Sequence, residues 1–160
     1  MDKNQLVLYE DFLMIIRDLT DTARGITGIE EEKALALSQN RPEYLEGFMK
    51  KEQACILKLR GLDQHRVRLE KSLGWESLTF SQILEVVDPI QQEYLKVLFH
   101  ELEQQLKLLL QFKEVAERIM NVRVYELLAA MKREAGIPYD RGRKAGPEGF
   151  PYANLCDRYG

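Results

Sequence analysis

The feature that most constrains this chain is one helical pattern that runs from residue 89 to residue 135. Apolar residues recur there at steps of three and four, as expected for one face of an α-helix. The stripe consists of Leu95, Leu98, Leu102, Leu106, Leu109, Phe112, Ala116 and Ile119, and it is taken up again by Met120, Val124, Leu127 and Met131. Such a helix is roughly 70 Å long at ~1.5 Å per residue, whereas globular helices average ~11–12 residues. It cannot lie inside a compact core, so it must pair lengthwise with other helices.

Two further long helical patterns are available as partners, over about residues 4–37 and 41–73. The first stripe is Leu6, Tyr9, Leu13, Ile16, Leu19, Ala23 and Ile26. The second is Leu45, Phe48, Cys55, Leu59, Leu62, Leu69 and Leu73, and the charged residues Glu52 and Arg66 fall on the same track. The spacing averages about 3.5 residues, which favours the shallow left-handed crossings of coiled coils and helical bundles.

Residues with strong preferences for helix ends mark the boundaries of the first two patterns. Gly25 and Gly28 interrupt the first pattern and make a bend plausible there. Asn40 predicts the N-cap of the second helix, with Pro42 in its first turn and Glu43 completing a capping box. Gly74 then predicts a left-handed cap at the end of that helix, and the following tryptophan is expected to pack back over it.

A short helix is expected between the second and the longest one. Thr79 and Gln82 form the signature of a capping box and start an element over about 79–87. Asp88 is then expected to cap the longest helix, with Pro89 at its first position and Gln91 closing a second capping box.

Residues 137–160 have a different composition and no helical period. They hold three Pro, four Gly, three Tyr and one Phe. The prediction is therefore an all-α protein with two parts. Residues 1–136 form a long antiparallel helical hairpin or coiled-coil-like bundle of three long helices and one short one, and residues 137–160 form an extended, flexible Gly/Pro/Tyr-rich tail.

The composition excludes several classes of partner and compartment. The net charge is −3, so no strong field attracts nucleic acid or an anionic membrane. No apolar run approaches the roughly 20 residues that cross a bilayer, which predicts no membrane insertion. The amino terminus lacks a signal-peptide pattern, and Cys55 and Cys156 match no metal or redox spacing. We expect a cytoplasmic chain with reduced thiols.

No group of residues along the chain has the pattern of a catalytic or metal site. His65 and His100 belong to no helical metal-binding motif, and Gly25 and Gly28 lack the rest of a phosphate loop. The glutamates at 30–32 point in different directions on a helix and are expected to be solvated. We therefore expect no enzyme, no cofactor and no metal.

The longest helix is apolar over a wider arc than one packing partner covers. Outside its main stripe it carries Tyr94, Val97, Phe99, Leu108, Leu110, Val115, Val122 and Tyr125. Two interpretations stay open. Either the short helix or a second copy of the chain, in a homodimer, covers these residues, or they form a groove for the amphipathic helix of a partner.

Several short motifs follow one another over nearly the whole chain: Glu30-Glu31-Glu32-Lys33-Ala34-Leu35, Arg41-Pro42-Glu43-Tyr44-Leu45, Lys51-Glu52, Leu59, Arg66, Leu69 and Leu73-Gly74. These motifs and the order of the helices resemble the FlgN-like family of flagellar export chaperones. In the tail, Tyr139-Asp140-Arg141-Gly142-Arg143 looks like the family's Tyr-Asp-x-x-Gly stretch, and Leu155-Cys156-Asp157-Arg158 looks like its closing Leu-Asp-Arg segment with a Cys inserted.

The resemblance implies a cytoplasmic chaperone of type III flagellar export that needs no nucleotide or metal. Such a protein binds the carboxy-terminal helices of the hook-associated proteins FlgK and FlgL, prevents their premature assembly and delivers them to the export gate. By resemblance, the cargo-binding residues are Val124, Leu127, Leu128 and Met131. The export-gate contact falls on Tyr139, with Asp140 and Gly142 beside it. The alternative is a homodimeric coiled-coil adaptor or regulatory protein of another pathway.

Overall fold

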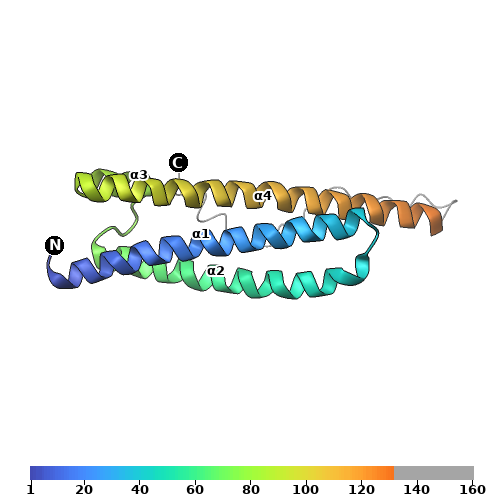
Figure 1. The fold of residues 1–160 in the computed structure, drawn as a ribbon, viewed down its shortest axis with the longest axis horizontal. Helices are drawn as coiled ribbons and strands as arrows, with labels where there is room; N and C mark the ends of the chain where they lie inside the picture. The colour runs from blue at the N-terminus through green and yellow to red at the C-terminus, as the bar shows by residue number, and fades with distance from the viewer. Residues whose placement is uncertain (132–160) are drawn as a thin grey trace.

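The computed structural model describes residues 1–131, and between residues 113 and 131 it describes the backbone alone. This part of the chain is helical and contains no strand, which confirms the predicted fold class (Figure 1). The helices are α1 (Lys3–Ser38), α2 (Leu45–Leu73), α3 (Phe80–Val86) and α4 (Pro89–Met131), with a 3-10 turn at Pro42–Tyr44 before α2. The predicted continuation of the last helix to residue 135 and the predicted tail lie outside the described residues.

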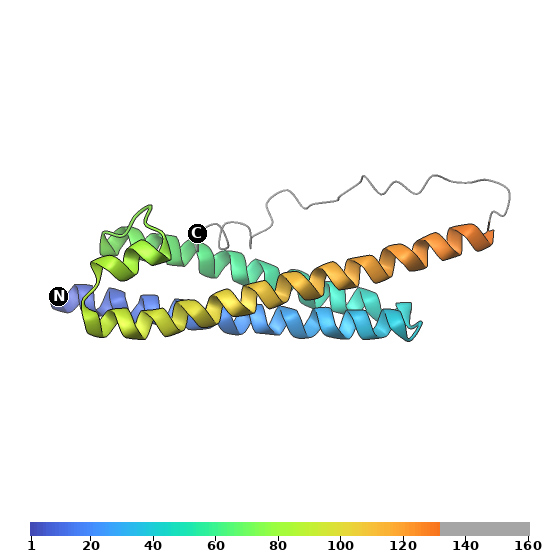
Figure 2. The ribbon, with the colours of Figure 1, turned by 90° about the horizontal axis from the view of Figure 1, so that it is seen from above.

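The helix α1 occupies the centre of the arrangement. It forms an antiparallel hairpin with α2 and also packs along α4, which runs parallel to it (Figure 1). Seen from above, α4 begins over α1 and crosses toward the side of α2 at its far end (Figure 2). The short helix α3 packs against α4 at the end of the molecule where α4 begins (Figure 2).

Because α1 contacts helices on two sides, it buries a wider arc than the single predicted stripe. Phe12 and Ile15 are buried as well as most of the stripe. The prediction that Leu6 lies in the core is wrong, because its side chain is 47% exposed. The helix also continues without a break through Gly25 and Gly28.

The predicted cap at Asn40 is wrong, because Asn40 ends α1 and does not start α2. Its backbone is left-handed, with φ of 60°. The amide of Asn40 donates to the carbonyl of Leu37 at 3.2 Å, and that of Arg41 donates to Ala36 at 2.8 Å. This pair of bonds is a Schellman motif, in which asparagine takes the position usually held by glycine. The chain then enters α2 through the 3-10 turn, without a side-chain cap.

The other predicted helix ends are confirmed. Gly74 is left-handed, with φ of 79°, at the end of α2. Thr79 and Gln82 form both bonds of a capping box at the start of α3. The carboxylate of Asp88 accepts from the amide of Gln91 at 2.8 Å and so caps α4. A further capping box at the start of α1, between Asp2 and Gln5, was not predicted.

Four aromatic side chains hold the end of the bundle where α3 lies. The ring of Phe12 from α1 meets Trp75 edge to face, with centroids 5.2 Å apart, and meets Phe99 of α4 in the same manner at 6.2 Å. Phe80 of α3 stacks on Phe99 at 4.2 Å. For Phe99, the interpretation that the short helix covers it is therefore confirmed. Trp75 is buried, and the residue that its ring meets is Phe12 of α1.

Candidate helix-binding surfaces

The predicted cargo residues lie on the part of α4 that projects beyond the hairpin. The backbone is helical as far as Met131, so Val124, Leu127, Leu128 and Met131 occupy positions on one face, at spacings of three, four and seven. The last turns of α4 extend past the connection between α1 and α2 (Figures 1 and 2). In the described part of the chain, no other helix runs beside these turns.

The predicted export-gate residues Tyr139, Asp140 and Gly142 lie outside the described residues. The side chains of Val115, Val122 and Tyr125, from the wide apolar arc of the longest helix, are also outside the described set. Within the described set, four members of that arc are exposed: Tyr94, Val97, Leu108 and Leu110. For these four residues, both a second copy of the chain and the helix of a partner therefore remain as interpretations.

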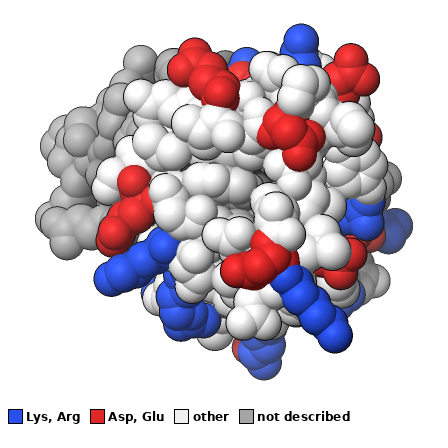
Figure 3. Space-filling view, turned by 90° about the vertical axis from the view of Figure 1, so that its left-hand side faces the viewer, with Lys and Arg blue, Asp and Glu red and all other residues white. Residues whose placement is uncertain are grey.

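A groove lies between α1 and α4 at the opposite end of the molecule, where both helices begin. We call it the α1/α4 groove. Its cavity volume is about 690 Å³, and its lining consists of Tyr9, Leu13, Ile90, Gln91, Glu93, Tyr94, Val97 and Leu98. Ile90 is 85% exposed and Val97 is 58% exposed. Viewed from this end, uncharged atoms occupy the middle of the surface and charged side chains surround them (Figure 3).

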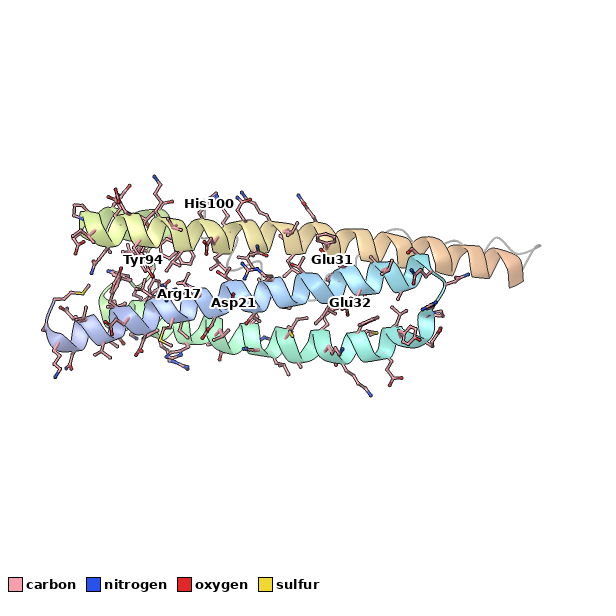
Figure 4. All side chains as sticks on the ribbon, in the orientation of Figure 1. Arg17, Asp21, Glu31, Glu32, Tyr94 and His100 are labelled. Carbon is pink, nitrogen blue, oxygen red and sulfur yellow. The ribbon has the colours of Figure 1, made fainter. Side chains whose placement is uncertain are left out.

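Two tyrosines supply polar groups to this mostly apolar groove. The guanidinium of Arg17 donates to the hydroxyl of Tyr94 and lies 5.5 Å from the centre of its ring, which ties α1 to α4 at one end of the groove (Figure 4). Burial raises the pKa of Tyr9, and the negative charge of Asp88 raises it further. The hydroxyl of Tyr9 is therefore neutral at physiological pH, so it adds no charge to the groove.

Sequence patterns had identified only part of this groove. Tyr94 and Val97 belonged to the predicted wide apolar arc, whereas Tyr9 and Leu13 had been assigned to the helix seam. Ile90 was missed because it stands at the start of α4, next to a proline that suggested only a helix end. Its signal was the helical spacing of Ile90, Tyr94 and Val97, at four and seven residues, which places the three on one face.

A cluster of buried charges joins α1 to α2. The expected solvation of the glutamates at 30–32 is wrong for Glu30, which is 0% exposed because it lies on the side of α1 that faces this cluster. The ammonium of Lys33 lies 2.6 Å from a carboxylate oxygen of Glu52 and 3.4 Å from one of Glu30. Burial alone would lower the pKa of Lys33, but the hydrogen bond to Glu52 and the negative charges of Glu30 and Glu52 outweigh that effect, so the pKa is raised. This cluster fixes the hairpin, and none of its residues lines the α1/α4 groove.

We expect Lys33→Met to lower the free energy of unfolding by roughly 1–3 kcal/mol at neutral pH, because it removes hydrogen bonds between charged groups. Since the folded pKa of Lys33 is raised, its contribution is complete below the unfolded pKa of about 10.4 and is lost as the pH rises through the folded value. Urea unfolding should therefore show a difference between the two proteins that is constant from neutral pH to about pH 9 and shrinks above about pH 10.4.

The matched control for this prediction is Lys50→Met. Lys50 pairs with Glu46 on the exposed face of α2, where an ion pair contributes about 0–1 kcal/mol. An equal loss of stability in both variants would contradict the role assigned to the buried cluster.

A second buried cluster surrounds Arg66, which is 0% exposed. Its Nη2 and Nε atoms lie 2.7 and 2.8 Å from one carboxylate oxygen of Asp63, and its Nη1 atom lies 2.5 Å from Glu70. The guanidinium also lies 5.5 Å from the centre of the Phe80 ring. The ion pairs lie within α2, and the contact with Phe80 connects the guanidinium to α3. These partners explain why an arginine can lie on the apolar track of the second helix.

His65 and His100 are both exposed, and Cys55 is half-buried on α2. Among the residues that the structure describes, no three His, Cys, Asp or Glu side chains lie close enough together to hold a metal ion. No helix in this part of the chain is both long and apolar enough to cross a membrane.

Searches of protein-family models, of curated proteins and of solved structures found no match to this chain. The likeness to the FlgN-like family thus rests on the motifs within the sequence.

Proposed function

We propose that this protein is an export chaperone for the hook-associated proteins FlgK and FlgL, and that it binds their carboxy-terminal amphipathic helices beside the projecting end of α4. One observation carries the proposal. The last turns of α4 continue past the hairpin, and their helical backbone brings four apolar positions onto one face where no described helix packs. A long amphipathic helix with no described helix beside its last turns suits the lengthwise docking of another helix.

Apolar burial would supply the affinity. Fully burying one Leu, Val or Met side chain contributes about 1.5–3 kcal/mol. Val124, Leu127, Leu128 and Met131, with matching residues of the cargo, could therefore offset the costs of association and reach the about 8 kcal/mol of a micromolar complex. By covering the apolar face of the cargo helix, the chaperone would prevent the cargo from polymerising, and no chemical step is needed. The tail, through Tyr139, Asp140 and Gly142, would then be available for contact with the export gate.

We expect Leu127→Asp and Leu128→Asp each to weaken binding of a FlgK or FlgL carboxy-terminal segment by roughly tenfold or more, because a charge would be buried at the centre of the interface. Isothermal titration calorimetry measures the affinity, and far-UV circular dichroism checks that helicity is kept. The matched control is Ala129→Asp, which adds the same charge at a position that helical spacing sets on another side of α4.

Two results would contradict this proposal. Normal binding by both leucine variants would show that the cargo site lies elsewhere. A well-folded chain that binds neither segment at micromolar concentration would remove the chaperone function altogether. If that chain also had twice its monomer mass in solution, the homodimeric adaptor would be the better description.

A further inference from the structure

The α1/α4 groove lies at the opposite end of the molecule from the proposed cargo site and needs a different occupant. Its exposed apolar residues, Ile90 and Val97, are costly to leave in water, and none of the described segments covers them. We propose that residues 150–155 of the same chain, Phe-Pro-Tyr-Ala-Asn-Leu, bind in this groove. This inference does not depend on the proposed chaperone function.

The composition of the segment suits the groove. Phe150, Tyr152 and Leu155 place three large apolar side chains within six residues. Pro147 and Pro151 disfavour a helix, so the segment would bind in an extended form. A cavity of about 690 Å³ is of the size that holds ligands with several rings. The polar side chains in its lining, Gln91 and Glu93, offer hydrogen-bond partners to a tyrosine hydroxyl.

The chain is also long enough to reach the groove from the end of α4. Val97 lies about 50 Å from Met131 along the helix, at ~1.5 Å per residue. An extended chain of ~3.3–3.6 Å per residue covers about 65 Å between residues 131 and 150. The segment can therefore run back along the bundle, antiparallel to α4, with Phe150 near Val97 and Leu155 toward Ile90.

Charge favours the same path. Residues 132–160 contain six Lys and Arg and four Asp and Glu, a net charge of +2, so residues 1–131 carry −5 of the total of −3. On that path the basic run at 141–144 lies six to nine residues before Phe150, about 20–30 Å from Val97 toward the far end of α4, so it would pass α1 near Glu31 and Glu32, which are exposed. Figure 4 shows Asp21, Glu31 and Glu32 spaced along α1 between the two ends of the bundle. Exposed pairs contribute only about 0–1 kcal/mol each, so charge would guide the segment and apolar contact would hold it.

Connection within one chain lowers the affinity that such a contact needs. A flexible linker gives an effective concentration of about 1 mM, so a contact with a dissociation constant of about 0.1 mM would be formed roughly nine-tenths of the time. A contact of that strength needs about 5.5 kcal/mol, and burial of Phe150, Tyr152 and Leu155, together with the apolar groove residues that they cover, would supply it net of the cost of ordering the segment.

The native Cys156, next to Leu155, offers a direct test. In the full-length Cys55→Ser protein, a nitroxide attached to Cys156 should broaden the amide NMR signals of residues 6–13 and 90–98. We expect those peaks to lose roughly half of their height or more, in keeping with the docked population, and the amides of α2 near Leu57 to lose little. Unchanged peaks at the groove would overturn the proposal.

Two matched variants and one mixing experiment complete the test. Val97→Asp and Ile90→Asp, both at exposed positions of α4, should abolish the broadening, whereas Leu57→Asp, at a position 64% exposed on α2, should leave it unchanged. Broadening that survives both groove variants, with helicity intact, would contradict the site. Isotope-labelled protein without nitroxide, mixed with unlabelled protein that carries it, should show no broadening. Broadening in that mixture would assign the groove to a second copy and overturn the proposal.

Discussion

Replacing Arg66 with alanine is expected to lower the free energy of unfolding by about 3–5 kcal/mol. The side chain is fully buried, and its guanidinium faces the carboxylates of Asp63 and Glu70 on the same helix. Glu70 is buried as well, so the truncation removes the cation that faces a buried negative charge. It also removes the side chain that packs over the ring of Phe80. Urea unfolding followed by circular dichroism measures the loss.

The double variant Arg66→Met, Glu70→Leu separates the cost of an uncompensated charge from the value of the ion pair. Apolar residues of similar volume often replace a buried pair at little cost, so we expect it to recover most of the stability lost in Arg66→Ala. The control Arg68→Ala removes an exposed arginine from the same helix and should change the stability by less than about 0.5 kcal/mol. If the double variant were as unstable as Arg66→Ala, packing around the guanidinium would be the dominant effect.

Phe12→Ala is expected to cost about 3–5 kcal/mol, because it opens a cavity where α1, α4 and the segment before α3 meet. The ring of Phe12 is fully buried and contacts both Trp75 and Phe99 edge to face. Its loss should also admit water to Trp75, the single tryptophan of the chain, and shift its fluorescence to longer wavelength. Urea unfolding followed by that fluorescence reports both effects.

Met14→Ala is the matched control for this prediction. Met14 lies two residues away on α1 and is largely exposed, so its truncation should change the stability by less than about 0.5 kcal/mol. A native-like fluorescence maximum in Phe12→Ala would show that the aromatic cluster closes over the cavity, and the expected loss of stability would then be smaller.

The amino-acid sequence by itself determined the helices and most of their ends. The caps at Gly74, Thr79 and Asp88 depend on hydrogen bonds between residues three to five apart, so local order is enough to predict them. The prediction from local sequence was wrong at Asn40, because asparagine suits both an N-cap and a left-handed position after a helix. The conformation of the turn between α1 and α2 places Asn40 at the end of α1.

Only the tertiary structure decided which face of each helix meets another helix. The sequence pattern could not show that α1 lies between α2 and α4, and so it placed Leu6 in the core and gave no reason for Phe12 to be buried. Periodicity predicts that a face is apolar but not what covers it, because the covering residues come from distant parts of the chain. The projecting end of α4 and the α1/α4 groove follow from the relative lengths and crossing of the helices, which only packing sets.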